Sequence, residues 1–361
     1  MKVAIIHDYL TQYGGAEKVL EAMHEIWPEA PVFTLFYDPK KMPKKFSSWD
    51  IRVSPIQNLP FGVSHYRAYL PLMPAAIERF NLTNYDLVIS NCSAYSKGVL
   101  THKGCTHFCY CHTPTRYLWS DTFDYIEHLS GIEKYFKKVL PVLLTYLRLW
   151  DEAASQRPDY FITNSKFVAQ RIKKYYHRDS VVIYPPVEFD QFYISKDLGN
   201  YFLVISRFRP YKRIDLAIEA FNELKLPLKI IGSGNDKYLR KIAGPSIEFL
   251  GNVSDKEKAE YLSRAQALIH PQEEDFGITP LEAMASGRPV IAYKKGGAKE
   301  TVIDGFTGKF FYPQSKDALI QAVSSFNPKD YNSYKIRDYV QKFSKERFKK
   351  ELKEFIFGKI K

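Results

Sequence analysis

Residues 271–287 read PQEEDFGITPLEAMASG, and this stretch decides how the chain is interpreted. It predicts a loop that leads into a helix, with carboxylates at Glu274 and Glu282. The start of a helix presents free backbone N–H groups and a partial positive charge, which favour an anion. Gly277 has no Cβ, so the backbone can come close to a ligand there. The segment therefore offers two carboxylates and an anion-binding helix start.

A purely structural interpretation of the same segment stays open. Thr279 is predicted to be the N-cap of the helix, Pro280 its first residue and Gly287 the residue that ends it. Thr279 and Glu282 then also fit a capping box, in which two side chains satisfy backbone N–H groups and need no ligand.

A second element upstream favours the ligand-binding interpretation. The apolar run 202–205 predicts a buried strand, and Ser206, Arg207 and Lys212 follow it in a polar loop. Ligands of open α/β sheets bind at the carboxyl ends of strands, and an arginine with a lysine there suits a diphosphate. A solvated basic turn is the alternative.

The composition is that of an ordinary globular protein. The chain has 361 residues, of which 45% are hydrophobic and 25% charged, so we expect about two domains. Residues 1–6 (MKVAII) predict a strand rather than a signal peptide, because no apolar segment with a cleavage site follows them. No apolar run approaches the roughly 18 to 20 residues that span a bilayer. We expect a cytoplasmic protein, peripheral on the inner face of the membrane if it binds lipid.

The charge points to an anionic partner. The formal net charge is +12, which attracts nucleotide-sugars, acidic lipid headgroups or nucleic acid. The 26 tyrosines and 25 phenylalanines, mixed with basic residues, also suit single-stranded nucleic acid. No motif for DNA or RNA binding occurs, so nucleic acid is not an expected partner. A non-catalytic nucleotide or single-stranded nucleic-acid binding protein is the alternative function.

The cysteines suggest a metal hypothesis that the spacing does not favour. Cys109, Cys111 and His112 stand close together, but structural zinc sites prefer cysteine pairs two to four residues apart, with a second pair further on. Residues 106–112 also predict a buried strand, in which cysteine packs as a small hydrophobic residue. We expect no metal site, and the lack of a secretory signal argues against disulfides.

Strands alternate with helices along the chain, which predicts parallel sheets built from βαβ units. The predicted strands are 3–6, 86–90, 106–111, 160–163 and 181–184, then 202–205, 228–231, 247–250, 267–270, 290–293 and 308–312. Helices are predicted near 16–26, from the Asn164-Ser165 cap to 175, from about 214, and over 345–357. The fold class is therefore α/β with two Rossmann-like domains. The domains are predicted at 1–190 and 191–344, followed by a helix over 345–361.

Two stretches are candidates for a membrane face or an acceptor groove. In residues 131–150, lysines alternate with aromatic and leucine residues, and Pro141 predicts a division into two helical pieces. An ordinary core helix with solvated lysines is the favoured alternative for this stretch. Residues 61–80 are the second candidate.

The motifs together resemble the retaining family-4 glycosyltransferases, which have the GT-B fold. Ser206-Arg207 with Lys212 is similar to the family's diphosphate-binding loop, and Glu274 with Glu282 is similar to its paired-glutamate motif. Matches in the family's order also occur at Gly14-Gly15, Asn164-Ser165, 184–187 and Gly296-Gly297. The resemblance covers nearly the whole chain. It implies two domains that face a cleft, with the C-terminal helix returning to the N-terminal domain.

A sugar-nucleotide donor leaves a diphosphate that gains negative charge as the glycosidic bond breaks. Arg207, Lys212 and the backbone amides of Phe276, Gly277, Ile278 and Thr279 are predicted to stabilise this charge, so no metal and no cofactor is expected. The resemblance implies that Glu282 binds the ribose and that Glu274 positions the sugar. Two-carboxylate glycosidase chemistry is the rival, but it has no need of the two cations. The predicted donor site is completed by Gly15, Ser206, Gly234 and Asn252.

The acceptor is predicted to bind the N-terminal domain. His7 follows the first strand, near the Gly14-Gly15 loop, and His112 and Arg116 follow another strand. The resemblance places a histidine near the reacting hydroxyl, which makes His112 a catalytic candidate beside Glu274 and the two cations. Arg116 is a candidate for an anionic group such as a lipid phosphate, so a glycan or lipid-linked acceptor is expected.

The donor itself is predicted from one further stretch. Residues 112–117 (HTPTRY) resemble mannosyltransferases of surface-polysaccharide assembly. GDP-mannose is therefore the first prediction for the donor, which is a substrate rather than a cofactor.

Overall fold

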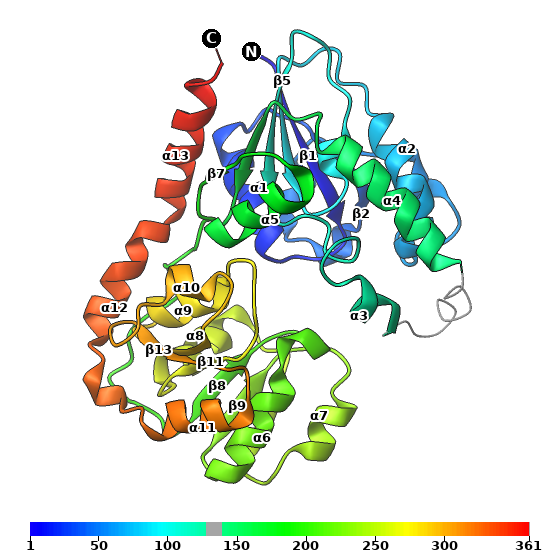
Figure 1. Ribbon diagram of the computed structural model, residues 1–361. Coiled ribbons are helices and arrows are strands. Elements are labelled where there is room, and N and C mark those ends of the chain that lie inside the picture. Colours follow the sequence, from blue (N-terminus) through cyan, green and yellow to red (C-terminus); the bar gives the residue numbers. More distant parts are fainter. Residues whose placement is uncertain (128–138, 361) are drawn as a thin grey trace. The chain divides into compact units, whose positions relative to one another are not determined.

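The computed structural model of the chain describes residues 1–127 and 139–360. The chain divides into two compact units. The first unit comprises Met1–Pro186 and Phe348–Lys361, and the second comprises Val187–Arg347. Each unit is an α/β layer structure around a parallel sheet, as the alternation of strands and helices predicts (Figure 1).

In the described part of the first unit, the sheet has seven strands in the order β3-β2-β1-β4-β5-β6-β7. The strands are β1 (Val3–Leu10), β2 (Val32–Tyr37), β3 (Ile51–Val53), β4 (Leu87–Cys92), β5 (Thr106–Cys111), β6 (Tyr160–Thr163) and β7 (Val181–Val182). The helices are α1 (Gly15–Ile26), α2 (Met73–Glu78), α3 (Thr122–Glu127), α4 (Leu140–Ala154), α5 (Lys166–Tyr176) and α13 (Lys345–Phe357).

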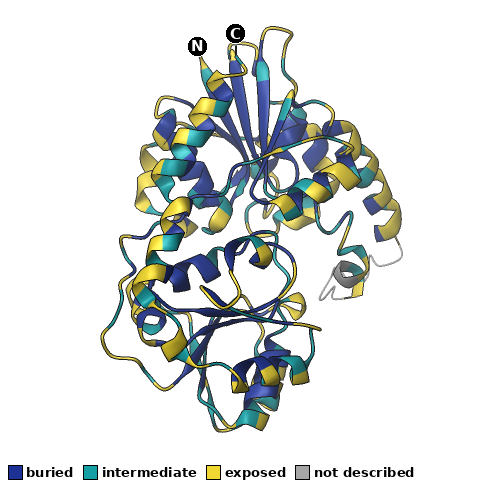
Figure 2. Ribbon diagram, turned by 60° about the vertical axis from the view of Figure 1, so that its left-hand side comes forward, coloured by how far each residue is buried: buried dark blue, intermediate teal, exposed yellow. Residues whose placement is uncertain are grey.

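Both faces of this sheet are covered, which explains why its central strands are largely apolar and almost wholly buried. Ala4 and Ile6 of β1 pack in a core with residues of α2 and α4, whereas Ile5 between them packs in a core with residues of α1 and α13. The strands are therefore buried while the helices expose one side to solvent (Figure 2). Helix α13 contributes Phe348, Leu352 and Ile356 to the second of these cores, so the C-terminal helix belongs to the first unit.

In the described part of the second unit, the sheet has six strands in the order β10-β9-β8-β11-β12-β13. The strands are β8 (Phe202–Ile205), β9 (Leu228–Ile231), β10 (Ile247–Gly251), β11 (Leu268–His270), β12 (Val290–Tyr293) and β13 (Gly308–Phe311). The helices are α6 (Ile214–Leu224), α7 (Lys237–Ile242), α8 (Asp255–Arg264), α9 (Ile278–Ala285), α10 (Ala298–Thr301), α11 (Lys316–Ser324) and α12 (Ser333–Tyr339).

Several predicted elements differ from the structure. Strand β1 runs on to Leu10, so His7 lies inside it rather than after it. Strands β2 and β3 were not predicted, although residues 32–36 are all buried and β2 lies between β1 and β3 in the sheet. Pro141 lies in the first turn of α4, where its missing N–H has no partner to lose. The helical piece predicted before it falls on residues outside the described part of the chain. The part of the predicted membrane stretch that covers residues 131–138 lies outside the described residues.

The cysteine-containing strand was predicted correctly. Cys109 and Cys111 are completely buried within β5, and all four cysteines of the chain are free thiols. Burial raises the pKa of the Cys109 thiol, which keeps it protonated and inert. Among residues 1–127 and 139–360, no group of three His, Cys, Asp or Glu side chains is placed to hold a metal ion. Nor does any described helix have the length and apolarity to cross a bilayer.

Candidate active site

The loops that follow two neighbouring strands of the second unit meet through an ion pair. Lys212 ends a short 3-10 turn after β8, and Glu274 lies in the loop after β11. The Lys212 ammonium donates to Glu274 Oε1, and Gln272 Nε2 donates to the same oxygen at 3.0 Å. The side chains of Lys212 and Glu274 are 13% and 25% exposed, so the pair is shielded but open to a ligand. Two residues predicted from separate motifs are thus brought together.

The electrostatics of this pair keep Glu274 ionised. Burial alone would raise the pKa of the Glu274 carboxyl, but the Lys212 ammonium, the His270 ring and two hydrogen bonds outweigh it and lower the pKa to about 2. Burial lowers the pKa of His270 to about 4, so this neighbour is neutral at physiological pH. Glu274 therefore presents a fixed negative charge that the Lys212 ammonium balances.

Two buried polar atoms beside this pair lack a hydrogen-bond partner within the described part of the chain. They are Nε2 of His270 and Oε1 of Gln272, and both residues are 2% exposed. A buried polar atom without a partner costs about 1–3 kcal/mol. Such atoms are suited to hydrogen-bond a polar ligand.

Gly296 and Gly297 pack closely against the backbone of the Glu274 loop. The backbone N–H of Gly297 donates to the Glu274 carbonyl at 2.8 Å. A Cβ on Gly297 would lie 2.4 Å from the Phe276 backbone, and a Cβ on Gly296 would lie 2.4 Å from the Glu274 carbonyl oxygen. The close approach of the two loops thus requires glycine at both positions.

The start of α9 differs from the sequence prediction. Gly277 is the N-cap, with φ +88°, and the helix begins at Ile278. Thr279 is therefore the second helical residue and not the N-cap, and the predicted capping box with Glu282 was wrong. The reason is that Gly277 turns the backbone into the left-handed region and starts the helix two residues early. Gly287 ends the helix region with φ +71°, as predicted.

Glu282 is instead held by a lysine that the sequence did not reveal. It is 5% exposed and accepts a hydrogen bond from Lys258 Nζ of α8 at 3.1 Å. Burial lowers the pKa of Lys258, but Glu282 and Asp255 outweigh it and raise the pKa. The carboxylate is thus held near the start of α9 by its contact with Lys258.

The remaining predicted donor residues lie on loops after β8, β9 and β10. Arg207 is exposed, and Ser206 before it is half-buried. Gly234, with φ +135°, pairs with Phe208 in an isolated bridge, and a Cβ on Gly232 would lie 1.8 Å from the Ser206 carbonyl oxygen. The glycines of the loop after β9 therefore allow this loop to pack closely against the Ser206–Phe208 loop. Asn252 is exposed after β10, two strands away from β8.

A second polar cluster lies in the first unit, across β1, β4 and β5. His112 Nε2 lies 2.6 Å from Asn91 Oδ1, and Asn91 Nδ2 lies 3.1 Å from His7 Nδ1 and 2.8 Å from the Ala16 carbonyl oxygen. His7 Nε2 lies 3.4 Å from Glu17 Oε1. The predicted residues His7 and His112 are thus brought together through Asn91.

The His112 ring is neutral in this cluster. Burial, and secondarily the neighbouring His7, lower the pKa of His112 to about 3. Asn91 and Glu17 were missed by sequence reasoning. Asn91 could have been found, because it lies near the carboxyl end of the apolar run 87–92, where site residues of parallel sheets gather.

Three further predicted residues of the first unit lie nearby. Gly14 is the N-cap of α1, and Gly15 is the first residue of that helix rather than part of a loop. Arg116 forms an ion pair with Asp121 at 2.8 Å, and its side chain is 30% exposed. Arg116 is therefore partly neutralised.

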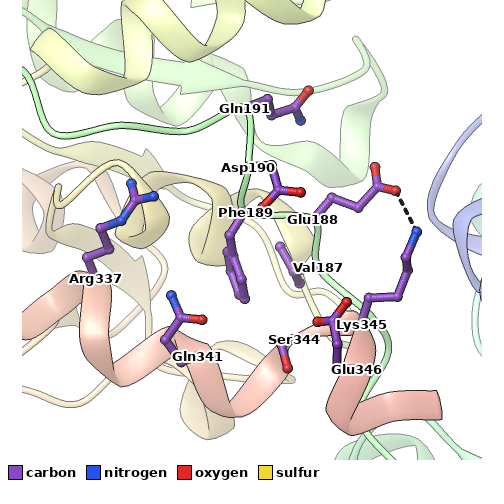
Figure 3. A pocket seen from close by; sticks show the side chains of 10 residues that line it. All are labelled: Val187, Glu188, Phe189, Asp190, Gln191, Arg337, Gln341, Ser344, Lys345 and Glu346. Carbon is purple, nitrogen blue, oxygen red and sulfur yellow. Dashed lines mark hydrogen bonds and ion pairs between the residues drawn. The ribbon is translucent and has the colours of Figure 1, made fainter.

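A cavity of about 410 Å³ lies elsewhere in the second unit, between the segments 187–191 and 337–346 (Figure 3). Its lining includes the ion pair of Glu188 with Lys345, at 3.3 Å. None of the site residues predicted from the sequence lines this cavity. The chemistry of the candidate site therefore rests on the two polar clusters.

Two protein families match adjoining parts of the chain. The family described as "Glycosyltransferase Family 4" matches residues 13–191, and "Glycosyl transferases group 1" matches residues 188–346. The chain belongs to the glycosyltransferases. The two matched regions contain every candidate residue except His7.

The curated relatives of this glycosyltransferase are modestly similar. An uncharacterized glycosyltransferase of Methanocaldococcus jannaschii is 31% identical over 167 residues, which cover 45% of this chain and 47% of that protein. The alpha-1,3/1,6-mannosyltransferase ALG2 of Dictyostelium discoideum is 28% identical, over 58% of this chain and 59% of that protein. ALG2 of Candida albicans is 26% identical over 84% of each. The match thus spans about half the length of the first two relatives.

Solved structures confirm the GT-B fold of this glycosyltransferase. HepE of Anabaena in complex with UDP superposes with a TM-score of 0.71 at 17% identity, over 99% of this chain and 100% of that one. Sucrose-phosphate synthase of Thermosynechococcus elongatus superposes with a TM-score of 0.74 at 18% identity, over 98% of each chain.

Proposed function

We propose that the protein is a retaining hexosyltransferase that moves a sugar from a nucleotide-diphosphate sugar to a glycan or lipid-linked acceptor. The observation that carries the proposal is the Lys212–Glu274 pair at the carboxyl ends of β8 and β11, beside the start of α9. A lysine, an exposed arginine and free helix N–H groups suit a diphosphate, and a fixed carboxylate suits sugar hydroxyls.

Each group then has a role in the reaction. The acceptor oxygen bonds to the anomeric carbon, the bond from that carbon to the diphosphate oxygen breaks, and the departing phosphate takes the acceptor proton. Lys212, Arg207 and the amides from Phe276 to Thr279 stabilise the charge on the leaving diphosphate. Glu274 is ionised, so it accepts hydrogen bonds from sugar hydroxyls and does not serve as an acid.

The neighbouring groups complete the donor site. The unpartnered atoms of His270 and Gln272 hydrogen-bond further hydroxyls of the sugar. Glu282 binds the ribose, with Gly15, Ser206, Gly234 and Asn252 in the rest of the donor site. His7, Gly14, His112 and Arg116 serve the acceptor.

GDP-mannose is the proposed donor. It is supported by the relatives that are named mannosyltransferases, of which ALG2 of Candida albicans matches 84% of this chain. The test is a thermal-shift comparison of GDP, UDP, ADP and their sugars, followed by a product assay with the donor that stabilises most. If only UDP or ADP stabilised the protein, a sugar of that nucleotide would replace GDP-mannose as the proposed donor.

We expect the reaction to need no metal ion, because cations and amides already cover the diphosphate. Turnover should be unchanged in excess EDTA. An absolute requirement for Mg²⁺ or Mn²⁺, restored on adding the ion back, would contradict this assignment of the site.

An anionic membrane surface is the proposed setting for a lipid-linked acceptor. Helix α4 buries Leu144 and Leu147 but leaves an apolar stripe in solvent. This stripe consists of Val139, Val142, Tyr146 and Leu149, which are 63%, 72%, 50% and 66% exposed. With a net charge of +12, the protein should sediment with anionic vesicles and not with neutral ones. Val142→Asp should weaken that binding, and equal sedimentation with both vesicles would exclude the proposal.

A further inference from the structure

The polar cluster of the first unit determines where His112 carries its proton. Asn91 Nδ2 lies 2.8 Å from the carbonyl oxygen of Ala16, which can only accept a hydrogen bond. The amide nitrogen must therefore face α1, and the amide oxygen must face His112. Because this oxygen also only accepts, His112 Nε2 must be the N–H that donates to it at 2.6 Å.

The same argument applies to His7. Asn91 Nδ2 donates to His7 Nδ1 at 3.1 Å, so the proton of neutral His7 is on Nε2, facing Glu17 Oε1 at 3.4 Å. Asn91 is completely buried, and His7 and Glu17 are 3% and 4% exposed. The amide is therefore closed off from bulk water, and turning it over would place its oxygen against the Ala16 carbonyl oxygen.

We propose that Asn91 is a positioning residue of the transferase: it holds His112 in the tautomer protonated at Nε2, so that Nδ1 is free to accept a hydrogen bond from a substrate hydroxyl. This inference rests on the proposed function. His112 is half-buried, so one edge of the ring reaches solvent. The hydroxyl belongs either to the acceptor or to the transferred sugar.

The parallel sheet explains why these residues meet. His7 of β1 and Asn91 of β4 are register partners, and the His112 N–H donates to the Cys92 carbonyl at 2.8 Å just after β5. Three side chains at the carboxyl end of adjacent strands thus form one row. Through the Ala16 carbonyl, the row reaches the start of α1 at Gly14 and Gly15. The tautomer of His112 therefore depends on the position of this helix start.

Within the described residues of the first unit, few titratable groups lie near His112. The titratable neighbours are His7, Glu17 beyond it, and Tyr110, whose ring centre lies 5.2 Å from that of His112. Tyr110 donates its hydroxyl to the Ile183 carbonyl at 2.9 Å and is not a base here. An uncharged amide is therefore required next to His112 if the ring is to stay neutral, and a carboxylate at position 91 would favour imidazolium.

The first experiment measures the tautomer without using activity. Nitrogen-15 NMR of the histidine rings in the wild-type protein should show His112 protonated at Nε2 alone from pH 5 to 8. A spectrum with the proton on Nδ1, or with both tautomers in exchange, would overturn the inference even if sugar transfer is found. The correct tautomer in a protein without transferase activity would instead overturn the proposed function alone.

The second experiment uses Asn91→Asp. Its carboxylate should raise the pKa of His112 and move the acid limb of the pH–rate profile upward by about 1–3 units, with activity recovered at high pH. Ser90→Ala is the matched control, because Ser90 is equally buried on β4 and contacts His107 at 2.9 Å instead. Ser90→Ala should lower the stability of the protein, but it should leave the acid limb of the pH–rate profile at its wild-type position. An unmoved limb in folded Asn91→Asp would contradict the proposal.

The third experiment is a double-mutant cycle. Asn91→Ala should lower kcat by about 10- to 100-fold, and should add little once His112 is already alanine. Multiplying effects on kcat would show that Asn91 acts independently of His112 and would contradict the proposal. If KM rises for the acceptor, the hydroxyl belongs to the acceptor. If KM rises for the donor, the hydroxyl belongs to the transferred sugar.

Discussion

The two polar clusters use burial in opposite ways. Around Glu274 in the second unit, an ammonium and hydrogen bonds overcome the effect of burial and lower the pKa to about 2, so the group stays charged. Around His112 in the first unit, burial acts unopposed and lowers the pKa to about 3, so the group stays neutral. Both clusters lie at the carboxyl ends of adjacent parallel strands.

The comparison separates two chemical tasks. In the proposed function, the diphosphate leaving group and the sugar need fixed charges, and the Lys212–Glu274 pair would provide them in a shielded loop. A hydroxyl group needs a neutral hydrogen-bond acceptor, which an imidazole provides only while it is unprotonated. The same scaffold therefore serves both tasks, and the residue beside the titrating group decides which one: a lysine in one unit and an asparagine in the other.

The largest effect is expected at the charged cluster. Lys212→Ala should lower kcat by two or more orders of magnitude, the scale observed when a developing charge loses its stabiliser. Burial of Glu274 would then be unopposed by the ammonium, so its pKa should rise and an acid limb should enter the pH–rate profile. Arg207→Ala should also lower kcat.

Lys316→Ala is the control for Lys212→Ala. Lys316 forms an ion pair with Glu223 on the surface at 2.7 Å, away from the strand ends of the site. It should leave the rate unchanged. Normal turnover in both Lys212→Ala and Arg207→Ala would remove the donor-site assignment.

Glu274→Gln should separate binding from transfer. It removes the negative charge but keeps a hydrogen-bonding side chain, so calorimetry should show nucleotide affinity within a few-fold of normal. Sugar transfer should fall by about 10- to 100-fold, because a charge-assisted hydrogen bond to the sugar becomes a neutral one. Unchanged transfer would take Glu274 off the list of catalytic residues.

Glu282→Gln should have a smaller effect, on donor binding. Since no capping box forms, the substitution removes only the charge that faces Lys258 and that, in the proposed donor site, would bind the ribose. Affinity for the nucleotide should fall by about tenfold, and the loss of one of the two carboxylates that pair with Lys258 should lower stability by about 1 kcal/mol, because Asp255 remains at 3.4 Å. Unchanged affinity with a lowered melting temperature would assign Glu282 to structure alone.

The smallest effect is expected in the pH dependence of stability. The pKa of His112 is about 3 in the folded chain and about 6.5 when unfolded, so the unfolded chain binds more protons between these values. Stability should therefore fall as the pH is lowered from 6.5 toward 3. In His112→Gln the fall should be shallower, as measured by urea unfolding at pH 4.5 and 7. His107, whose pKa burial lowers to about 3, contributes in both proteins, so an unchanged slope would mean that His112 is not buried neutral.

Elements with a strong local pattern were predicted correctly. The apolar runs of β5, β6, β8, β9 and β12 coincide with the predicted strands, and α13 has the predicted bounds. Strand β2 was missed although its largely apolar run follows Pro28 and Pro31, which mark a turn before it. The start of α9 was misplaced because the φ angle of Gly277 cannot be read from the types of its neighbours.

The site was predicted as residues but not as contacts. Sequence motifs named Lys212, Glu274, Glu282, His7 and His112. They did not reveal Lys258, Gln272 or Asn91, which carry no motif and whose importance lies in the atom each one faces.

By itself, the sequence determined the class of the molecule. Hydrophobic periodicity, glycines at strand ends and the order of the motifs are local properties, and they specify parallel α/β units and the types of residue available for catalysis. Only the tertiary structure decided the charge states. Lys212 meets Glu274 across 62 residues of sequence, and Asn91 meets His112 across 21. A pKa and a tautomer depend on the distance to such partners and on burial, which arise only when separate strands are aligned in one sheet.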